Sequence, residues 1–351
     1  MWRAGSDRHG QDSRQGVRGD ANLENQDIAR ILIYGDIHLN SKNYGSHIDY
    51  AKESLECFRK ITEVAREHKA THLIGLGDIS YSRFHSLEYR SEVEKELMEQ
   101  YNLVSGNRYE LKGNHDSAGY GMTEYEYYII KGLLKPSCNM TIGNLHITMV
   151  DYKKHTTVVP NINLEPGATN VILAHDYYKF KDTPVPNFGK AIELETLKKW
   201  YGADYLVCGH IHNQLAFRGF MKKDTLDGEE QRELIIHYPG CITRPAYSEG
   251  TLTETGQFVL ITVKDSGDVI YDIIEFDLPP IADIFNLSAK KEEKIQKEVK
   301  RAQIDISDII QRMSQRENID WDHFGIIENM QVEQKYKDKA IELLKAAHNE
   351  K

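Results

Sequence analysis

The stretch Ile31-Leu32-Ile33-Tyr34-Gly35-Asp36-Ile37-His38 sets the pattern that decides the fold of this 351-residue chain. An apolar run typical of a buried strand is followed directly by Gly, Asp and His. Four more blocks follow in order, each after its own apolar run: Gly77-Asp78, Gly113-Asn114-His115-Asp116, Ala174-His175-Asp176 and Gly209-His210-Ile211-His212. Because open α/β sheets bind ligands at the carboxyl ends of their strands, the five blocks predict one site built from five strand ends.

These residue types suit two metal ions acting on a phosphate ester. In-line hydrolysis uses two cations about 3.5–4 Å apart, which clamp the ester oxygens and acidify a water molecule. One carboxylate has to bridge the cations, and Asp78 is the candidate because its block offers a single ligand between two richer blocks. Asp36 and His38 would hold the first metal. Their side chains can point the same way only if the backbone turns between them, and Gly35 permits such a turn.

The other candidate ligands complete the two metal sites. The argument for Asp36 and His38 applies equally to His210 and His212, and the neutral side chains of Asn114 and His175 would complete the second metal. The whole set is rich in imidazole and contains no thiolate. It therefore favours Mn, which we expect, or Fe, Zn or Co, over Mg or Ca.

His115 is the candidate catalytic residue that is not a ligand. It lies beside Asn114 and before Asp116, so we expect its ring to face the substrate and to be oriented by the Asp116 carboxylate. It would protonate the leaving oxygen or donate to the phosphoryl charge. Any one of these residues alone is more commonly a solvated or core polar residue, but five ordered blocks outweigh that alternative. Isolated histidines are expected to be structural or surface residues: His68, His72, His146, His237, His323 and His348.

The order Asp-x-His, Gly-Asp, Gly-Asn-His-Asp, His and Gly-His-x-His resembles that of the calcineurin-like metallophosphoesterases over roughly residues 29–279. The resemblance implies a four-layer α/β/β/α sandwich with a dinuclear metal site at the strand ends. It also implies the ligands of each metal and makes His115 the catalytic histidine. Metal one is held by Asp36, His38, Asp78 and His212, and metal two by Asp78, Asn114, His175 and His210.

A later stretch points to a subfamily. His237-Tyr-Pro-Gly240-Cys-Ile-Thr-Arg244 is similar to the Tyr-Pro-Gly-Ser-x-x-Arg stretch of SbcD-type DNA-repair nucleases, with Cys241 in place of Ser. Some of those nucleases have a His three residues after the bridging Asp, where this chain has Tyr81, and His85 is the candidate substitute.

Three functions are compared on this basis. The leading hypothesis is a Mn-dependent nuclease that cleaves DNA rather than RNA, with a metal-bridging hydroxide as nucleophile. The alternative is a small-molecule (nucleotide) phosphodiesterase or a phosphatase on the same site. A binding scaffold without chemistry is disfavoured, because all seven candidate ligands are present.

Three segments beside the blocks interleave aromatic and basic residues: Tyr81-Ser-Arg-Phe-His85, Asp151-Tyr-Lys-Lys-His155 and Tyr177-Tyr-Lys-Phe-Lys181. In loops next to a phosphoesterase site such residues stack bases and contact phosphates. In the alternative interpretation the aromatic residues plug the sheet edge and the lysines are solvated. The candidate substrate-binding residues are Tyr81, His85, Tyr177, Lys179 and Lys181.

Composition limits the partners and the compartment. The net charge of −10 argues weakly against non-specific binding of polyanions, although two bound dications would offset part of it at the site. No stretch approaches the roughly 18 apolar residues needed to cross a membrane, so we expect a soluble protein with no membrane partner. Four widely spaced cysteines without a Cys-x-x-Cys motif suit a reducing compartment, and we expect a cytoplasmic location.

Three regions are predicted along the chain. Residues 1–27 are expected to be a disordered basic tail, residues 28–280 the catalytic domain, and residues 281–351 a helical C-terminal appendage after Pro279-Pro280. Helices predicted over 290–315 and 331–348 would pack on the core or dock a partner. The resemblance implies that this partner is a coiled-coil ATPase subunit, and a homodimer is left open.

Helices and strands alternate in the first part of the predicted domain, and strands dominate after residue 208. Helices are predicted over 47–68, 86–101, 122–134 and 191–201. Strands are predicted over 31–35, 71–77, 109–112, 171–174, 205–208, 214–219, 233–238, 257–264 and 269–276. A hairpin is predicted from 140–142 and 146–151, with Gly143-Asn144 in its turn.

Overall fold

The computed structural model describes residues 26–40, 42, 49–81, 85–117, 121–153, 162–183, 190–225, 228–245 and 253–286, and isolated positions beyond residue 286. The chain divides into two compact units, one of residues 1–41 and 51–278 and the other of residues 42–50 and 279–351. In the second unit, α4 (Ile281–Ile284) is a single turn that follows Pro280. The basic tail up to residue 25 and, apart from isolated positions, the helices predicted beyond residue 290 lie outside the described residues. Their assignments stay predictions.

The first unit contains two six-stranded sheets. In the first sheet, with strand order β14-β13-β1-β2-β3-β4, the strands from β1 to β4 are parallel neighbours, and β13 is antiparallel to both β1 and β14. Its strands are β1 (Asp27–Tyr34), β2 (His72–Gly75), β3 (Arg108–Glu110), β4 (Lys135–Pro136), β13 (Thr255–Lys264) and β14 (Val269–Asp277).

The second sheet has the order β11-β12-β10-β7-β6-β5, with parallel strands at its centre and one antiparallel strand at each edge. Its strands are β5 (Met140–Ile142), β6 (Leu145–Val150), β7 (Thr169–His175), β10 (Tyr205–Gly209), β11 (Leu215–Thr225) and β12 (Gly228–Tyr238). The predicted hairpin of β5 and β6 is confirmed.

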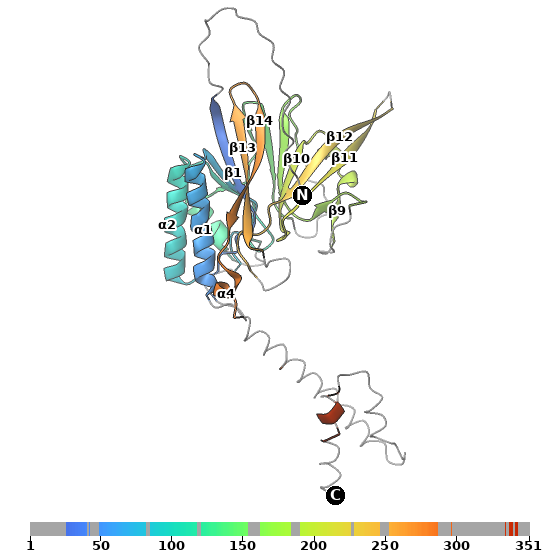
Figure 1. Cartoon of the computed structure of the whole chain (residues 1–351). Helices are drawn as coiled ribbons and strands as arrows, with labels where there is room; N and C mark the ends of the chain where they lie inside the picture. Colours follow the sequence, from blue (N-terminus) through green and yellow to red (C-terminus); the bar gives the residue numbers. More distant parts are fainter. Residues whose placement is uncertain are drawn as a thin grey trace, which may run out of the picture. The chain divides into compact units, whose positions relative to one another are not determined.

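Alternation along β1 shows how the layers are held together. Leu32 and Tyr34 point to one face of the first sheet, where they pack among residues of the helices. Ile31 and Ile33 point to the other face, where they pack against residues of β6, β7 and β10 from the second sheet. A central strand buried on both faces needs such a continuous apolar run, and Figure 1 shows the helices and the second sheet on opposite sides of β1 and β13.

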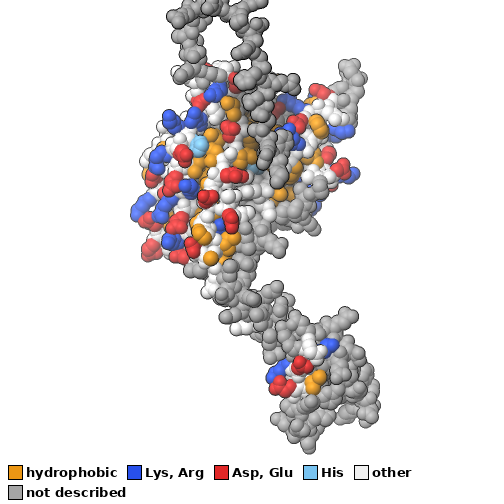
Figure 2. All heavy atoms as spheres, viewed as in Figure 1, with side chains coloured by type: hydrophobic (Ala, Val, Ile, Leu, Met, Phe, Trp, Pro, Cys, Tyr) orange, Lys and Arg blue, Asp and Glu red, His pale blue; other side chains and the backbone are white. Residues whose placement is uncertain are grey.

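Three α-helices belong to the helical layer: α1 (Tyr50–Glu67), α2 (Leu87–Leu103) and α3 (Glu124–Ile130). Ser86 caps α2, and Thr123 forms a capping box with Glu126 at the start of α3. The outer surface of α1 and α2 is a mixture of acidic and basic side chains (Figure 2), including the exposed ion pairs Arg59–Glu92 and Arg66–Glu99. Among the described residues, no helix is long and apolar enough to span a membrane.

The layer outside the second sheet differs from the prediction. The helix predicted over 191–201 was wrong: this segment forms the short β9 (Ile192–Glu193), which pairs with β8 (Tyr178–Lys179), and two 3₁₀-helices, η1 (Leu194–Thr196) and η2 (Lys198–Trp200). Leu194, Leu197 and Trp200 are buried and lie three residues apart. A spacing of three matches the 3₁₀-helix, which has three residues per turn, and so places all three side chains on one buried face.

Glu53 of α1 is a buried carboxyl group whose charge is expected to make stability depend on pH. Its Oε1 lies 3.5 Å from Nη1 of Arg244. Burial raises the pKa of Glu53 from 4.5 to about 7, although the Arg244 guanidinium opposes this shift. Because the pKa is higher in the folded than in the unfolded state, the stability that this group contributes is complete below about pH 4.5 and is lost as the pH rises through 7.

We therefore expect Glu53→Gln, which mimics the neutral carboxyl, to be more stable than the wild type at pH 8 by about 3 kcal/mol and equally stable below about pH 4. Urea unfolding of both proteins at several pH values measures this difference. Glu56→Gln, at an exposed position of the same helix, is the comparison variant, because it removes the same charge without removing a buried carboxyl group. A constant difference for Glu53→Gln would contradict the expectation.

Candidate metal centre

The five predicted blocks meet where the two sheets face each other. Asp36, Asp78 and Asn114 follow the parallel neighbours β1, β2 and β3 of the first sheet. His175 ends β7 and His210 follows β10, which are parallel neighbours in the second sheet. The site is therefore assembled from the carboxyl ends of strands from both sheets.

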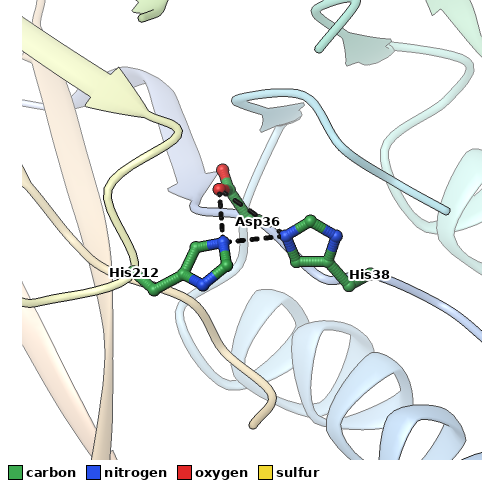
Figure 3. A group of neighbouring side chains, drawn as sticks. All are labelled: Asp36, His38 and His212. Carbon is green, nitrogen blue, oxygen red and sulfur yellow. Dashed lines mark hydrogen bonds and ion pairs between the residues drawn. The ribbon is translucent and has the colours of Figure 1, made fainter. Parts of the chain in front are cut away.

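One group of ligand atoms is formed by Asp36, His38 and His212 (Figure 3). The Nε2 atoms of His38 and His212 are 2.9 Å apart, and Oδ2 of Asp36 lies 3.9 Å from the first and 3.6 Å from the second. Burial is the largest cause that lowers the pKa of both histidines, to about 4 for His212, so both rings are neutral near pH 7. Neutral imidazole is the form that binds a metal, and the three convergent donors fit a divalent cation.

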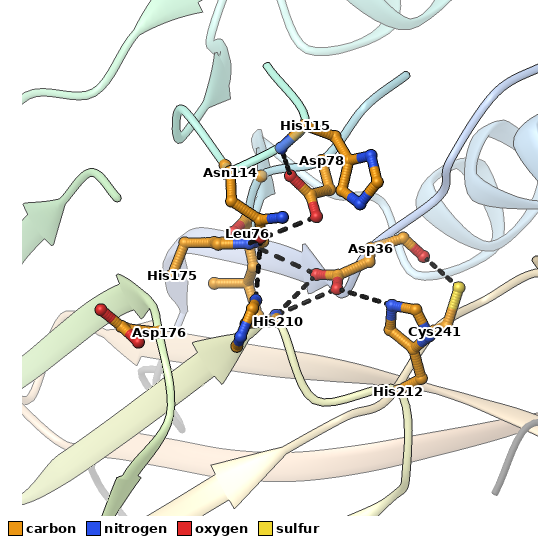
Figure 4. A network of polar contacts seen from close by, with 12 residues as sticks. Asp36, Leu76, Asp78, Asn114, His115, His175, Asp176, His210, His212 and Cys241 are labelled. Atoms are coloured by element: carbon orange, nitrogen blue, oxygen red, sulfur yellow. Dashed lines mark hydrogen bonds and ion pairs between the residues drawn. The ribbon is translucent and has the colours of Figure 1, made fainter. Parts of the chain in front are cut away.

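A second group is formed by Asn114, His175 and His210 (Figure 4). Oδ1 of Asn114 lies 3.0 Å from Nε2 of His175 and 2.8 Å from Nδ1 of His210. Asp78 lies between the two groups, with its Oδ2 3.4 Å from Nε2 of His175 and 3.8 Å from Nε2 of His38. The arrangement thus brings all seven predicted ligands together and puts the candidate bridging carboxylate within reach of both groups.

The charges of the second group also suit a cation. Burial alone would lower the pKa of His175, but the carboxylates of Asp78 and Asp36 outweigh it and raise this pKa to about 10. A positive charge is therefore favoured between the two carboxylates. A divalent metal ion would take the place of that proton.

The backbone at the ligands is strained. Among the described residues, five that are not glycine have a positive φ, and three of them are ligands: His38 (52°), Asp78 (54°) and His210 (78°). Such conformations cost energy and concentrate at functional sites. The turn between Asp36 and His38 is therefore made at His38, and the prediction that Gly35 supplies it was wrong. Gly35 instead makes room for a neighbour, because a Cβ there would collide with the carbonyl oxygen of Gly240.

The stretch 238–244, which the sequence marked only as a subfamily feature, braces the first ligand group. The Cys241 thiol and the Ile242 N–H donate to the carbonyl oxygen of Asp36, both at 3.0 Å. Thr243 donates to the carbonyl oxygen of Ile37, and the Cys241 N–H donates to that of His212. These bonds connect the loop of Asp36 and His38 to the loop of His212, which come from different sheets.

Gly240 is expected to be essential to this brace. Its φ is +79°, and an added Cβ would lie 2.8 Å from the carbonyl oxygen of His212. Gly240→Ala should lose about 1–2 kcal/mol for the left-handed backbone and should also bind Mn more weakly, because His212 is displaced. Gly132, with φ +72° and nothing within 4 Å of an added Cβ, is the matched control. Unfolding and Mn titration of both alanine variants measure these effects. Equal Mn affinities of the two variants would contradict the expectation.

A buried polar network lies behind Asp78. Glu110, which is fully buried, accepts a hydrogen bond from the N–H of Gly77, one residue before Asp78. Its carboxylate also pairs with Arg108 at 3.0 Å and accepts from the hydroxyl of Tyr34 at 2.6 Å. These residues were not singled out from the sequence, because charged residues inside short strands have no distinctive local pattern.

His115 and Asp116 have different surroundings from those predicted. The Asp116 carboxylate is buried and accepts hydrogen bonds from the N–H groups of Asp78 (2.8 Å) and Gly113 (2.9 Å). The prediction that it orients the His115 ring was wrong, because it instead connects two ligand loops. The His115 side chain is exposed, and its ring stacks on that of Tyr81 with centroids 5.2 Å apart. The backbone N–H of His115 donates to Oδ1 of Asp78 at 2.8 Å.

The candidate substrate-binding residues are separated by the fold. Tyr81 lies at the site, 40% exposed beside His115. His85 is buried, with Nε2 3.0 Å from the hydroxyl of Ser80 and its ring 4.9 Å from that of Tyr89, and burial lowers its pKa to about 4. Its role as the substitute for the histidine that some SbcD-type nucleases have at the position of Tyr81 stays a prediction. Tyr177 is buried in the core outside the second sheet. Lys179 is half-buried in β8, and Lys181 is exposed, with its N–H on Glu195.

One residue next to the ligand groups, Tyr152, was not named as a candidate site residue from the sequence. Tyr152, in the second interleaved segment, stacks on His210 with centroids 6.3 Å apart and meets His175 edge-on at 6.2 Å. Its N–H donates to the carbonyl oxygen of Lys112, two residues before Asn114. The signal in the sequence was its position directly after β6, beside β7.

The fold and the two ligand groups are those of a metallophosphoesterase. The sequence model of the calcineurin-like phosphoesterases matches residues 29–214, more than half of the chain, so the chain belongs to this family. The predicted family and fold class are confirmed. Members of the family use a dinuclear metal site, and this chain has a candidate ligand cluster for it.

Similar solved structures include proteins with different descriptions. A dimetal phosphatase from Danio rerio is 10% identical, with 72% of this chain and 100% of that chain covered and a TM-score of 0.41. Vps29 of Chaetomium thermophilum is 13% identical (72% and 100% covered, TM-score 0.28), and the Pseudomonas putida nuclease MPE is 14% identical (69% and 87% covered, TM-score 0.30). No curated protein matches the chain.

Proposed function

We propose that this protein is a metal-dependent phosphodiesterase that cleaves nucleic acid, DNA in preference to RNA, as SbcD-type nucleases do. The observation that carries the proposal is the position of Asp78, with Oδ2 between two groups of ligand atoms and with the exposed His115 next to them. Two divalent cations bound there would polarise the phosphoryl oxygens and acidify a water molecule.

The chain's own residues would then divide the remaining work. Asp36, His38 and His212 would hold one cation, and Asn114, His175 and His210 would hold the other, with Asp78 shared. His115 gives a proton to the leaving oxygen, since it is exposed at the edge of the centre. Tyr81 supports the His115 ring from one face, and Asp116 keeps the loops of Asp78 and Asn114 in register.

Mn is the proposed metal because the ligands combine imidazole nitrogens with carboxylate and amide oxygens. The test is a panel of single-stranded and duplex DNA, RNA, nucleotides and phosphomonoesters, assayed with Mn, Fe, Zn or Co after treatment with a chelator. We expect DNA cleavage that the chelator abolishes and Mn restores. Hydrolysis of a nucleotide or a phosphomonoester without cleavage of any strand would overturn the proposal and support the small-molecule alternative.

The proposed protein partners depend on residues 290–351. Docking of a coiled-coil ATPase subunit on residues 290–351, and a homodimer, stay predictions, since these helices lie outside the described residues apart from isolated positions.

A further inference from the structure

Two tyrosines lie beside the two ligand groups, one next to each. Tyr81 stacks on His115 at 5.2 Å with 25° between the rings, and it meets His38 of the first group edge-on at 5.7 Å. Tyr152 stacks on His210 of the second group at 6.3 Å with 23° between the rings. Each ring is thus nearly parallel to an imidazole of the site. Tyr81 follows β2 of the first sheet, and Tyr152 follows β6 of the second sheet.

The two tyrosines are held in the site in similar ways. The N–H of Tyr152 is held by the carbonyl oxygen of Lys112, and the N–H of Tyr81 by that of Leu39, so both backbones are anchored to loops of the site. Tyr81 is 40% exposed and Tyr152 is half-buried, so neither residue is enclosed in the core. Neither ring is needed to hold a cation, because the seven ligands already supply both groups.

We propose that Tyr81 and Tyr152 stack the two bases that flank the scissile phosphate, Tyr81 on the side of the leaving group and Tyr152 on the other side. This inference rests on the proposed function and makes its substrate more specific. His115, the proton donor to the leaving oxygen, lies against Tyr81, which assigns Tyr81 to the leaving side. A base has a planar face that an aromatic ring binds whatever the sequence, so the contact selects for nucleotides without reading them.

The arrangement favours an unpaired strand. Two bases that each stack on a separate tyrosine cannot also stack on one another or remain paired in a duplex, so we expect single-stranded DNA or frayed ends to be cleaved faster than an intact duplex. A phosphomonoester or a mononucleotide offers at most one base and uses only one of the two tyrosines.

Dinucleotides with a single phosphodiester bond provide the test. Thymidylyl-thymidine is compared with two analogues in which one or the other nucleoside is replaced by an abasic sugar, and the products identify the leaving side. Tyr81→Ala is expected to lower kcat/KM for the intact dinucleotide by about 5- to 150-fold. On the analogue without a leaving-side base the loss should be clearly smaller, because only the support of the His115 ring is removed there. Tyr152→Ala is expected to do the same for the other analogue.

Controls separate stacking from support of His115. Tyr81→Phe and Tyr152→Phe keep the rings and should show the same loss as the wild type when a base is replaced by an abasic sugar. Phe220→Ala, at a 57% exposed position of β11 outside the ligand groups, should change nothing. If Tyr81→Ala lost activity equally on the intact and the abasic substrates, its role would be to position His115, and the stacking inference would be wrong. A wild type that cleaves strands but is insensitive to either abasic substitution would overturn the inference and leave the proposed function intact. A wild type that cleaves no strand would overturn both.

Discussion

Asp78→Asn is expected to abolish turnover and to remove the stabilisation that added Mn gives the wild type. Asp78 is shared by both ligand groups, and asparagine keeps its shape but loses the negative charge that a bridging ligand needs. Removing a residue that only supports a metal ligand costs about 10–100-fold in affinity or activity. We therefore expect the loss of a shared ligand to exceed about 100-fold in kcat/KM.

Thermal unfolding with and without Mn provides a second measurement for this variant. At a Mn concentration about 100 times the dissociation constant, binding stabilises the folded state by about 2.7 kcal/mol, which corresponds to about 5–10 °C for a domain of this size. The Asp78→Asn variant should lose this increase in Tm, measured against its own metal-free Tm. Retention of both the Mn-induced increase and turnover would refute the bridging role.

Asp176→Asn is the matched control for Asp78→Asn. Asp176 directly follows the ligand His175, but its carboxylate accepts a hydrogen bond from the backbone N–H of Tyr177 and is not one of the seven candidate ligands (Figure 4). This variant removes the same charge from the same region. It should keep its response to Mn and at least most of its turnover.

His115→Asn is expected to lower kcat by about 10²–10⁴-fold on a phosphodiester with an alkoxide leaving group, the range that general acid catalysis provides. On a p-nitrophenyl ester the loss should be much smaller, because p-nitrophenolate leaves without needing a proton. A ring nitrogen of the exposed His115 lies within 4.8 Å of ligand atoms of His38 and Asp78. The seven candidate ligands do not include His115, so we expect the variant to retain Mn. Steady-state kinetics on the two esters and Mn titration measure these effects.

The dependence on the leaving group is what distinguishes an acid from a residue that only binds phosphate. Equal losses on both esters would mean that His115 donates to the phosphoryl charge and does not protonate the leaving oxygen. His68→Asn, at the end of α1, is the control, since the sequence predicts no role for it in the site. It should behave like the wild type on both substrates.

Much of the fold was visible in local patterns. The hairpin of β5 and β6, the helices α1 to α3 and most strands lie where apolar periodicity and turn residues predict them, within a few residues. The segment 191–201 was mistaken for an α-helix because spacings of three residues occur in both kinds of helix over so short a length. Only packing against the second sheet distinguished them.

The sequence by itself determined the family and the seven candidate ligands, because each ligand directly follows an apolar run in a short, distinctive block. Only the tertiary structure decided what surrounds those ligands. The hydrogen bonds of Cys241 and Thr243 to the loop of Asp36, the two backbone contacts of Asp116 and the stacking of Tyr152 on His210 all join residues from separate segments. Such contacts depend on how two sheets face each other, and residues tens of positions apart leave no local pattern that reveals them.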